Sequence, residues 1–231
     1  MVIRAVLWDI DDTIFDHTTA DRIGTRKHLE QHGLPDGYEN VEQALVAWRE
    51  LSDAHWVRFA AGETDFRGQR RERVREFLSR ALDDAEADDW FARHAAHYEA
   101  AWSLFPDVLP VLDLLAEGFR HAVLSNASIQ NQDPKLRRLG VRDRFEAVVC
   151  AVELGVSKPD AGAFHAACEV LALEPGEVAY VGNEPDIDAG GAVAAGLMGI
   201  WLDRAGLGGR PELVRISGLD QLPGLLGPVR P

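Results

Sequence analysis

The fold of this chain is decided near its start, where residues 2–13 read Val-Ile-Arg-Ala-Val-Leu-Trp-Asp-Ile-Asp-Asp-Thr. A short apolar run with β-branched residues is typical of a buried parallel strand. The run ends in three carboxylates and a hydroxyl, and open α/β sheets bind their ligands beyond the carboxyl ends of the strands. The sequence therefore predicts a functional site that begins at Asp9.

Asp9 and Asp11 are two residues apart, and on an extended chain this spacing directs both side chains to the same side. Two close carboxylates tend to separate in pKa, so that one stays charged while the other can carry a proton. The pair could therefore act as a nucleophile and an acid/base. Taken alone, the same acids could instead form a solvated turn or cap the next helix.

Three more polar motifs follow, each after a predicted strand. They are Ser125-Asn126 after residues 119–124, Lys158-Pro159 after residues 147–151, and Gly182-Asn183 with Asp188 after residues 177–181. A hydroxyl and an amide at the end of a strand suit phosphate oxygens, although both also cap helices. A lysine before a helix can balance a carboxylate and hold a transferring group, although a surface lysine is the commoner case.

From residue 105 onward the pattern alternates between helix and strand. Further strands are predicted at 199–203 and 213–216, and helices at 108–117, 163–171 and 189–196. Such alternation with short connections predicts right-handed crossovers, and therefore an α/β fold in which a parallel sheet carries helices on both faces.

Residues 16–99 have a different pattern, because their apolar residues recur at spacings of three and four. Breaks at 33–37 and 61–63 divide this stretch, which predicts a helical insert. Asp16, His17, Trp56 and Arg58 are candidate substrate contacts, although a core or hinge role fits each of them better.

Three arginines of the insert, Arg67, Arg71 and Arg75, fall on one helical face and could attract an anionic substrate. Glu72 and Glu76 are interleaved with them, so a solvated, salt-bridged face is the favoured interpretation.

His94 and His97 have a spacing seen in helical metal pairs, but no acidic partner pattern accompanies them, and we expect no metal there. Cys150 and Cys168 lack a CxxC spacing, so neither a disulfide framework nor a zinc site is indicated, and a reducing cytosol fits.

The composition limits the possible partners. The 231 residues carry 24 basic and 38 acidic side chains, a net charge of −14, which would repel nucleic acid. Met1 leads directly into the first strand, and no apolar run is long enough to span a bilayer. We expect a cytoplasmic protein without an export or membrane segment, and its oligomeric state is not predicted.

In content and order, the four motifs resemble those of the haloacid dehalogenase (HAD) superfamily of phosphohydrolases. The resemblance implies a Rossmann-like core domain, residues 1–15 and 100–231, with an α-helical cap domain, residues 16–99, inserted as a lid. It also implies that Asp9 attacks phosphorus to form an aspartyl-phosphate and that Asp11 serves as acid and then base. Thr13 would steady the loop that holds Asp11, and Ser125, Asn126 and Lys158 would bind the phosphate.

The excess of negative charge at the predicted site indicates a metal cofactor. Asp9, Asp11, Asp188 and a phosphate dianion outnumber Lys158, and oxygen-only ligands favour Mg²⁺. The Asp9 and Asp188 carboxylates and the Asp11 carbonyl are the predicted ligands. Asn183 is a further candidate, although it stands where the family usually has an aspartate and would bind magnesium less strongly.

The leading hypothesis is a Mg²⁺-dependent phosphomonoesterase that acts on a small phosphorylated metabolite of unspecified identity. A 2-haloacid dehalogenase would keep the aspartate nucleophile but would have no use for Asp11 or for a metal. A HAD-like binding or regulatory module is the third alternative, and Asn183 is its only support.

Overall fold

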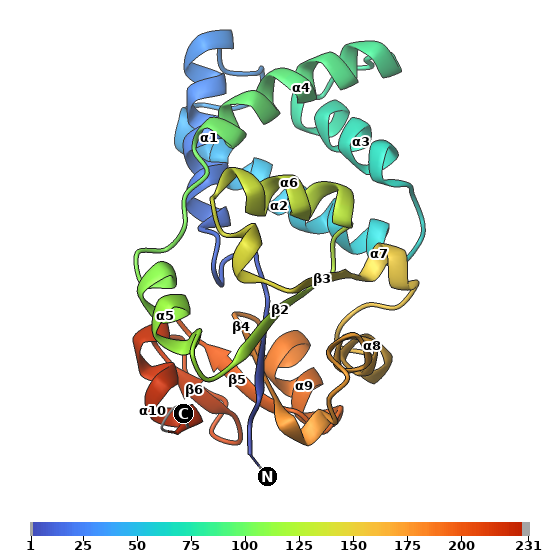
Figure 1. Cartoon of the computed structure of the whole chain (residues 1–231). Coiled ribbons are helices and arrows are strands. Elements are labelled where there is room, and N and C mark those ends of the chain that lie inside the picture. Colours follow the sequence, from blue (N-terminus) through green and yellow to red (C-terminus); the bar gives the residue numbers. More distant parts are fainter. Residues whose placement is uncertain (1, 228–231) are drawn as a thin grey trace. The chain divides into compact units, whose positions relative to one another are not determined.

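The computed structural model describes residues 2–227. The chain divides into two compact units: a core unit, Met1–Asp16 with Ser103–Pro231, and a helical unit, His17–Trp102. Every strand of the described residues belongs to the core unit, and the helical unit consists of helices and their connections (Figure 1).

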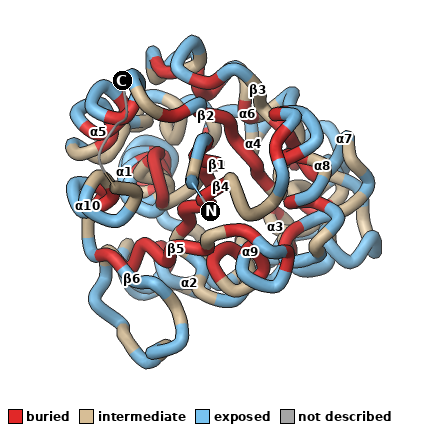
Figure 2. Tube along the Cα trace, turned by 60° about the horizontal axis from the view of Figure 1, so that its bottom comes forward, coloured by how far each residue is buried: buried red, intermediate tan, exposed pale blue. Residues whose placement is uncertain are grey.

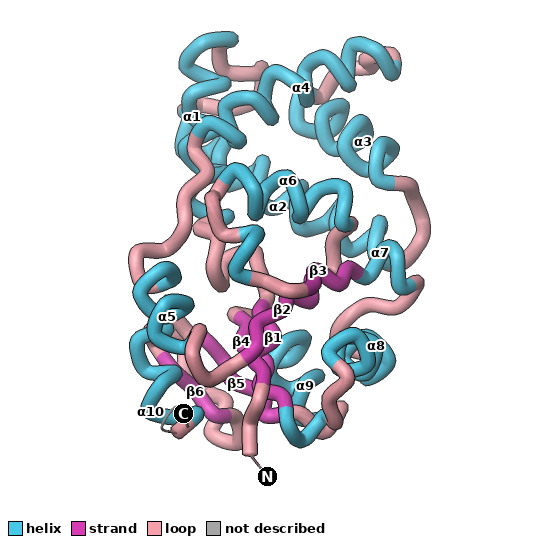
Figure 3. Tube along the Cα trace, in the orientation of Figure 1, coloured by secondary structure: helices cyan, strands magenta, loops and turns pink. Residues whose placement is uncertain are grey.

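Six strands of the described chain form one parallel sheet in the order β3-β2-β1-β4-β5-β6 (Figure 3). They are β1 (Ala5–Trp8), β2 (Arg120–Ser125), β3 (Ala147–Cys150), β4 (Val178–Gly182), β5 (Met198–Leu202) and β6 (Val214–Ile216). The five later strands agree with their predicted ranges to within one residue at either end, which confirms the predicted parallel α/β fold.

The opening strand β1 lies in the middle of the sheet, between β2 and β4, and all four of its residues are fully buried (Figure 2). A strand covered on both faces needs apolar side chains on both, which explains the continuous apolar run. The strand order reverses at β1: β2 and β3 follow on one side, and β4 to β6 on the other. Ligands of open α/β sheets bind at such a reversal, so the topology places the crevice next to Asp9.

Helices cover both faces of the sheet. On one face, α8 (Ala161–Leu171) and α9 (Gly191–Ala194) pack on the strands in an apolar cluster that includes Leu7, Leu124 and Tyr180. In Figure 1, α5 (Val108–Leu115) and α10 (Leu222–Leu226) lie on the other side of the sheet from α8. The remaining segments are α6 (Ile129–Arg138), α7 (Ala151–Leu154) and the 3₁₀ helices Arg142–Arg144, Pro175–Glu177 and Leu219–Gln221.

Several helices differ from the predictions, among them the short α7 and α10, which were not predicted. The helix expected at 189–196 begins earlier, at Pro185, with a π-type turn η3 (Pro185–Gly190), and only α9 continues it as an α-helix. Proline at the first helical position explains the early start, because its fixed φ suits a helix and its missing N–H needs no partner there. Helix α6 was not predicted at all, since Pro134 and mostly polar residues hide its periodicity.

The helical unit contains α1 (His17–His32), α2 (Val41–Ala60), α3 (Phe66–Leu78) and α4 (Asp84–Ala100). Their core includes Leu29, Trp48 and Phe77, which belong to the apolar residues that recur at helical spacing in the sequence. Side chains of Asn40, Asp65 and Asp83 cap α2, α3 and α4, and this satisfies N–H groups that the first turn leaves without partners.

Two of the three arginines singled out on α3 form ion pairs, as expected for a salt-bridged face, but their partners are acids of α4 rather than the interleaved Glu72 and Glu76. Arg71 pairs with Asp84 and Asp88, and Arg75 also pairs with Asp84. Both described cysteines are buried and unbridged. Among residues 2–227, none of the helices combines the length and the apolar composition that a membrane crossing requires.

Candidate active site

The four motifs meet where the three central strands end. Asp9 directly follows β1, Ser125 is the last residue of β2, and Asp188 lies in the turn that follows β4. These strands are hydrogen-bonded neighbours in parallel register, so their carboxyl ends lie at one edge of the sheet. The predicted meeting of these side chains is therefore a property of the sheet order.

Lys158 is the link between the motifs. Its Nζ donates to Oδ1 of Asp9 at 2.8 Å, to Oδ1 of Asp188 at 2.7 Å and to the hydroxyl of Tyr180 at 2.6 Å. The lysine is 4% exposed, Asp9 7% and Asp188 2%, so the ammonium group and both carboxylates are shielded from water. Burial alone would lower the pKa of Lys158, but Asp188 and Asp9 raise it well above its usual value, so the ammonium stays charged.

The Asp9 carboxylate is fixed at both oxygens, because the Thr13 hydroxyl donates to Oδ2 at 3.0 Å while Lys158 holds Oδ1. Thr13 thus contacts Asp9, whereas the sequence analysis assigned it to the loop that holds Asp11. Burial raises the pKa of Asp9 to about 7, and the Asp188 and Asp11 carboxylates add to this, although Lys158 opposes it. One ammonium group between two buried carboxylates leaves negative charge that is not fully compensated.

Asp11 is held by helix α6. Lys135 Nζ donates to its Oδ1 at 2.6 Å and Gln132 Nε2 donates to its Oδ2 at 2.9 Å. Gln132 and Lys135 are three residues apart, so they lie on one face of α6, and both are buried. Lys135 also lies 4.6 Å from the centre of the Phe15 ring. Neither residue was predicted from the sequence, because the helix that carries them was not predicted.

Tyr180 was also missed. It lies inside β4, accepts from Lys158 and donates to the carbonyl of Leu124 at 3.0 Å. A tyrosine in an otherwise apolar strand needs a partner for its hydroxyl, and this was the one signal that could have identified it.

Ser125 and Asn126 play different parts. The Ser125 hydroxyl accepts from the Gln132 amide and from the N–H of Ala127, so the hydroxyl can contribute to a ligand only as a donor. The Asn126 side chain accepts from the N–H of Lys158 at 2.8 Å and donates to its carbonyl at 3.0 Å. In this structure the Asn126 amide is therefore a clamp on the backbone that presents Lys158.

The turn after β4 is built around Asp188. Its Oδ2 accepts from the N–H of Glu184 at 2.9 Å. A Cβ on Gly182 would lie 2.3 Å from the Asp188 carboxyl carbon, so glycine is required for that side chain to turn back onto the strand. Asn183 is half-buried, and its carbonyl accepts from the Trp201 indole. Asp186 is exposed and pairs with Arg210, so it does not replace the missing aspartate.

The donor set fits a hard divalent cation. Asp9 and Asp188 offer carboxylate oxygens at a buried position, and a bound cation would offset the burial and the neighbouring carboxylates that raise the pKa of Asp9. The structure corrects the charge count, because Lys135 adds a second ammonium group beside Asp11. Three carboxylates still face two lysines before a phosphate adds its own charge.

The candidate substrate residues fall at the domain junction and in the helical unit. Asp16 ends the first segment of the core unit, and His17 begins α1, where its Nδ1 lies 2.8 Å from the Tyr98 hydroxyl. Arg58 is paired with Glu63 and Glu72, and Trp56 packs on Phe59. None of these contacts tests a substrate role.

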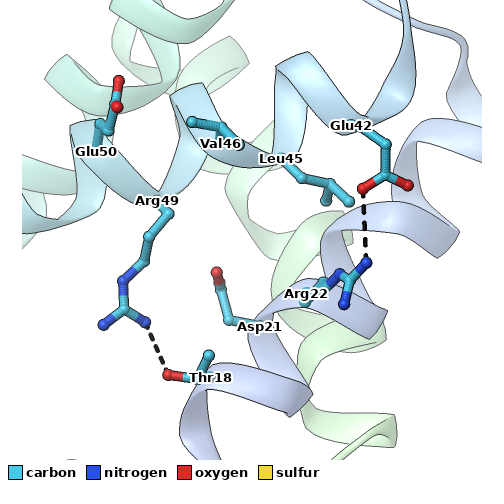
Figure 4. A pocket seen from close by; sticks show the side chains of 8 residues that line it. All are labelled: Thr18, Asp21, Arg22, Glu42, Leu45, Val46, Arg49 and Glu50. Carbon is cyan, nitrogen blue, oxygen red and sulfur yellow. Dashed lines mark hydrogen bonds and ion pairs between the residues drawn. The ribbon is translucent and has the colours of Figure 1, made fainter. Parts of the chain in front are cut away.

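The helical unit has a cavity of its own, of about 370 Å³, lined by α1 and α2 (Figure 4). Arg49 donates to the Thr18 hydroxyl at 3.2 Å, and Arg22 lies 3.6 Å from Glu42. Both arginines that line the cavity are therefore already engaged within the unit (Figure 4).

The Rossmann-like sheet, the aspartate after its first strand and the lysine between that aspartate and a second one are the features that the resemblance to HAD proteins led us to expect. The sequence model of the haloacid dehalogenase-like hydrolase family matches residues 3–196, and the chain belongs to that family.

Three known proteins illustrate the similarity. Glyceraldehyde 3-phosphate phosphatase of Methanopyrus kandleri is 29% identical over 208 residues, which cover 88% of this chain and 85% of the relative. The putative HAD-hydrolase YfnB of Bacillus subtilis has a TM-score of 0.79 at 20% identity, over 98% of this chain and 99% of that one. A 2-haloacid dehalogenase of Pseudomonas syringae has a TM-score of 0.69 at 27% identity, over 97% and 98%.

Proposed function

We propose that this hydrolase is a Mg²⁺-dependent phosphomonoesterase that hydrolyses a small phosphorylated metabolite through an aspartyl-phosphate on Asp9. The observation that carries the proposal is the buried Lys158 ammonium that joins Asp9 to Asp188, with a second acid, Asp11, nearby. The similarity to glyceraldehyde 3-phosphate phosphatase supports the same class of reaction.

In the first step, an oxygen of Asp9 attacks phosphorus and the bond from phosphorus to the alcohol oxygen breaks. Thr13 and Lys158 hold the carboxylate in one orientation, so little reorganisation is needed when the substrate arrives. Lys158 also places positive charge near the oxygens of the transferred phosphoryl group. The Ser125 hydroxyl already accepts two hydrogen bonds, so it can only donate one to these oxygens.

Asp11 acts as the general acid and then as the general base. It donates a proton to the departing alcohol oxygen, then takes one from the water that attacks the aspartyl-phosphate, which releases phosphate and restores Asp9. Because both carboxylate oxygens of Asp11 are held by α6, the side chain must leave Lys135 or Gln132 to reach the leaving group. Helix α6 therefore holds Asp11 next to Asp9, in a position that Asp11 must leave before it transfers a proton.

The Asp9 and Asp188 carboxylates and the Asp11 carbonyl would hold Mg²⁺, with Asn183 as a further oxygen donor. When bound, the ion neutralises charge on the phosphate and on Asp9. In keeping with the family resemblance, we assign the helical unit to recognition of the rest of the substrate. Asp16, His17, Trp56 and Arg58 are the candidates to test.

The decisive experiment measures phosphate release from an aryl phosphate and from a panel of phosphorylated metabolites, with Mg²⁺ and with EDTA. We expect turnover that requires Mg²⁺ and falls at least about a thousandfold in Asp9→Asn and Asp9→Ala. Asp12→Asn is the matched control, since it removes a carboxylate from the same turn and asparagine tolerates the left-handed φ of +59° found there. Undiminished turnover in both Asp9 variants would exclude the mechanism.

Dehalogenation remains the second candidate because of the similarity to a 2-haloacid dehalogenase. A halide leaves as a stable anion and needs no proton, whereas an alkoxide does, so the second acid favours phosphate esters. Halide release from 2-chloropropionate, with Asp11→Asn as active as wild type, would reverse this choice. Binding of phosphorylated ligands without turnover in Mg²⁺ would instead favour a binding or regulatory module.

A further inference from the structure

A histidine cluster in the helical unit has no part in the proposed reaction. His28 and His32 lie on α1 and His97 lies on α4, and one ring nitrogen from each lies within 4.8 Å of those from the other two. Helices α1 and α4 pack against each other within the helical unit. The cluster thus bridges two helices that are far apart in sequence.

His28 is the residue that needs explaining. It is 1% exposed, and neither of its ring nitrogens has a hydrogen-bond partner among the described residues. A buried polar group without a partner costs free energy, and a bound ion is one way in which such a group is satisfied. Its ring lies 4.6 and 5.8 Å from those of His32 and His97, between centroids, and one of its two nitrogens lies within 4.8 Å of a nitrogen of each.

We propose that His28, His32 and His97 form a binding site for a first-row transition-metal ion of the Zn²⁺ type. His28 and His32 are four residues apart, which places both rings on one face of α1 one turn apart. His97 completes a set of three imidazoles, and three histidines with an open fourth position are an established way to hold zinc. Imidazole selects such metals over Mg²⁺, which prefers oxygen.

The geometry requires only local adjustment. In a tetrahedral site with bonds of about 2.0–2.1 Å, ligand atoms are about 3.4 Å apart, so nitrogens that lie within 4.8 Å of one another must approach by at most about 1.4 Å. His32 is exposed and His97 half-buried, so their side chains can move while His28 stays fixed. Burial lowers the pKa of His28 to about 4, with His32 and His97 adding to this, so the ring is neutral and can ligate.

His94 is not part of the site. Its Nε2 is taken by the Thr25 hydroxyl at 2.8 Å, and its ring stacks on Trp90. The sequence analysis had only His94 and His97 to consider and expected no metal. Packing of α1 on α4 brings His28 and His32, rather than His94, next to His97.

A competition titration tests the proposal. Untagged protein is stripped with EDTA, dialysed, and titrated with Zn²⁺ against a chromophoric indicator in excess Mg²⁺, which occupies the carboxylate site of the core unit. We expect one Zn²⁺ bound per chain. His32→Ala and His97→Ala should each weaken binding at least about tenfold, since even loss of an outer contact to a ligand costs that much.

His165→Gln is the matched control, because this exposed histidine on α8 lies in the core unit, outside the cluster. Both ligand variants replace side chains that are not fully buried, and circular dichroism verifies that they fold. Zn²⁺ should also raise the thermal unfolding temperature of wild type and of His165→Gln, but not of the ligand variants. No Zn²⁺ uptake by wild type, or equal uptake by the ligand variants, overturns the proposal; phosphatase activity does not enter this test.

Discussion

Replacement of Lys158 by methionine should destabilise the core unit far more than the same replacement of Lys135. Lys158 is 3% exposed at its side chain and neutralises two carboxylates that are 11% and 2% exposed. Removal of one partner from a buried ion pair costs about 3–5 kcal/mol, because the remaining charge is left uncompensated. Methionine keeps most of the side-chain volume, so the loss reports charge rather than a cavity.

Lys135 is the internal comparison. It is also buried, but its partner Asp11 is 37% exposed at the side chain and keeps its hydrogen bond from Gln132. Water can therefore solvate the Asp11 carboxylate, and we expect Lys135→Met to cost about 1–2 kcal/mol. The two variants make the same chemical change to lysines of one domain and differ chiefly in how deeply their partners are buried.

Hydrogen exchange measured by mass spectrometry over a urea series gives the free energy of unfolding of β1 and β4 separately from the helical unit. The measurement is made in EDTA at pH 8. The Lys158→Met deficit should shrink as the pH falls from 8 through about 7, because the wild-type Asp9, whose pKa is about 7 with Lys158 beside it, then becomes protonated and loses its ion pair, whereas Asp9 of the variant, without the lysine that lowers its pKa, is protonated already at higher pH. Equal losses in the two variants, or a Lys158→Met deficit that is independent of pH, would refute this account of the site.

Two more predictions concern the metal. Mg²⁺ competes with a proton for Asp9, whose pKa is raised from 3.8 to about 7. The apparent Mg²⁺ affinity should therefore fall about tenfold per pH unit below pH 7 and level off above it. Equal affinities measured by calorimetry at pH 6 and pH 8 would contradict this prediction. Asn183→Asp restores a carboxylate to the turn after β4 and should raise the Mg²⁺ affinity of the phosphatase, measured as the activation constant for phosphate release. An unchanged constant would show that residue 183 does not face the ion, and Asp186→Asn, which alters an exposed residue of the same turn, is the control.

The sequence by itself determined the strands and the end of the sheet at which the chemistry lies. Local patterns carry this information, because β1 must be apolar on both faces and polar residues are tolerated only where a buried strand ends. Asp9, Lys158 and Asp188 could be named because each follows such an end or precedes a helix. The apolar set of the helical unit could be named in the same way, since it repeats with the period of a helix.

Only the tertiary structure decided which groups meet. Gln132 and Lys135 reach Asp11 from a helix whose proline hides it in the sequence, and Tyr180 joins Lys158 from inside a strand. The three histidines are brought together by the packing of α1 on α4. Contacts between residues from different elements depend on the sheet order and on helix packing. No local pattern encodes either one, because the same periodicity is compatible with many arrangements of the elements.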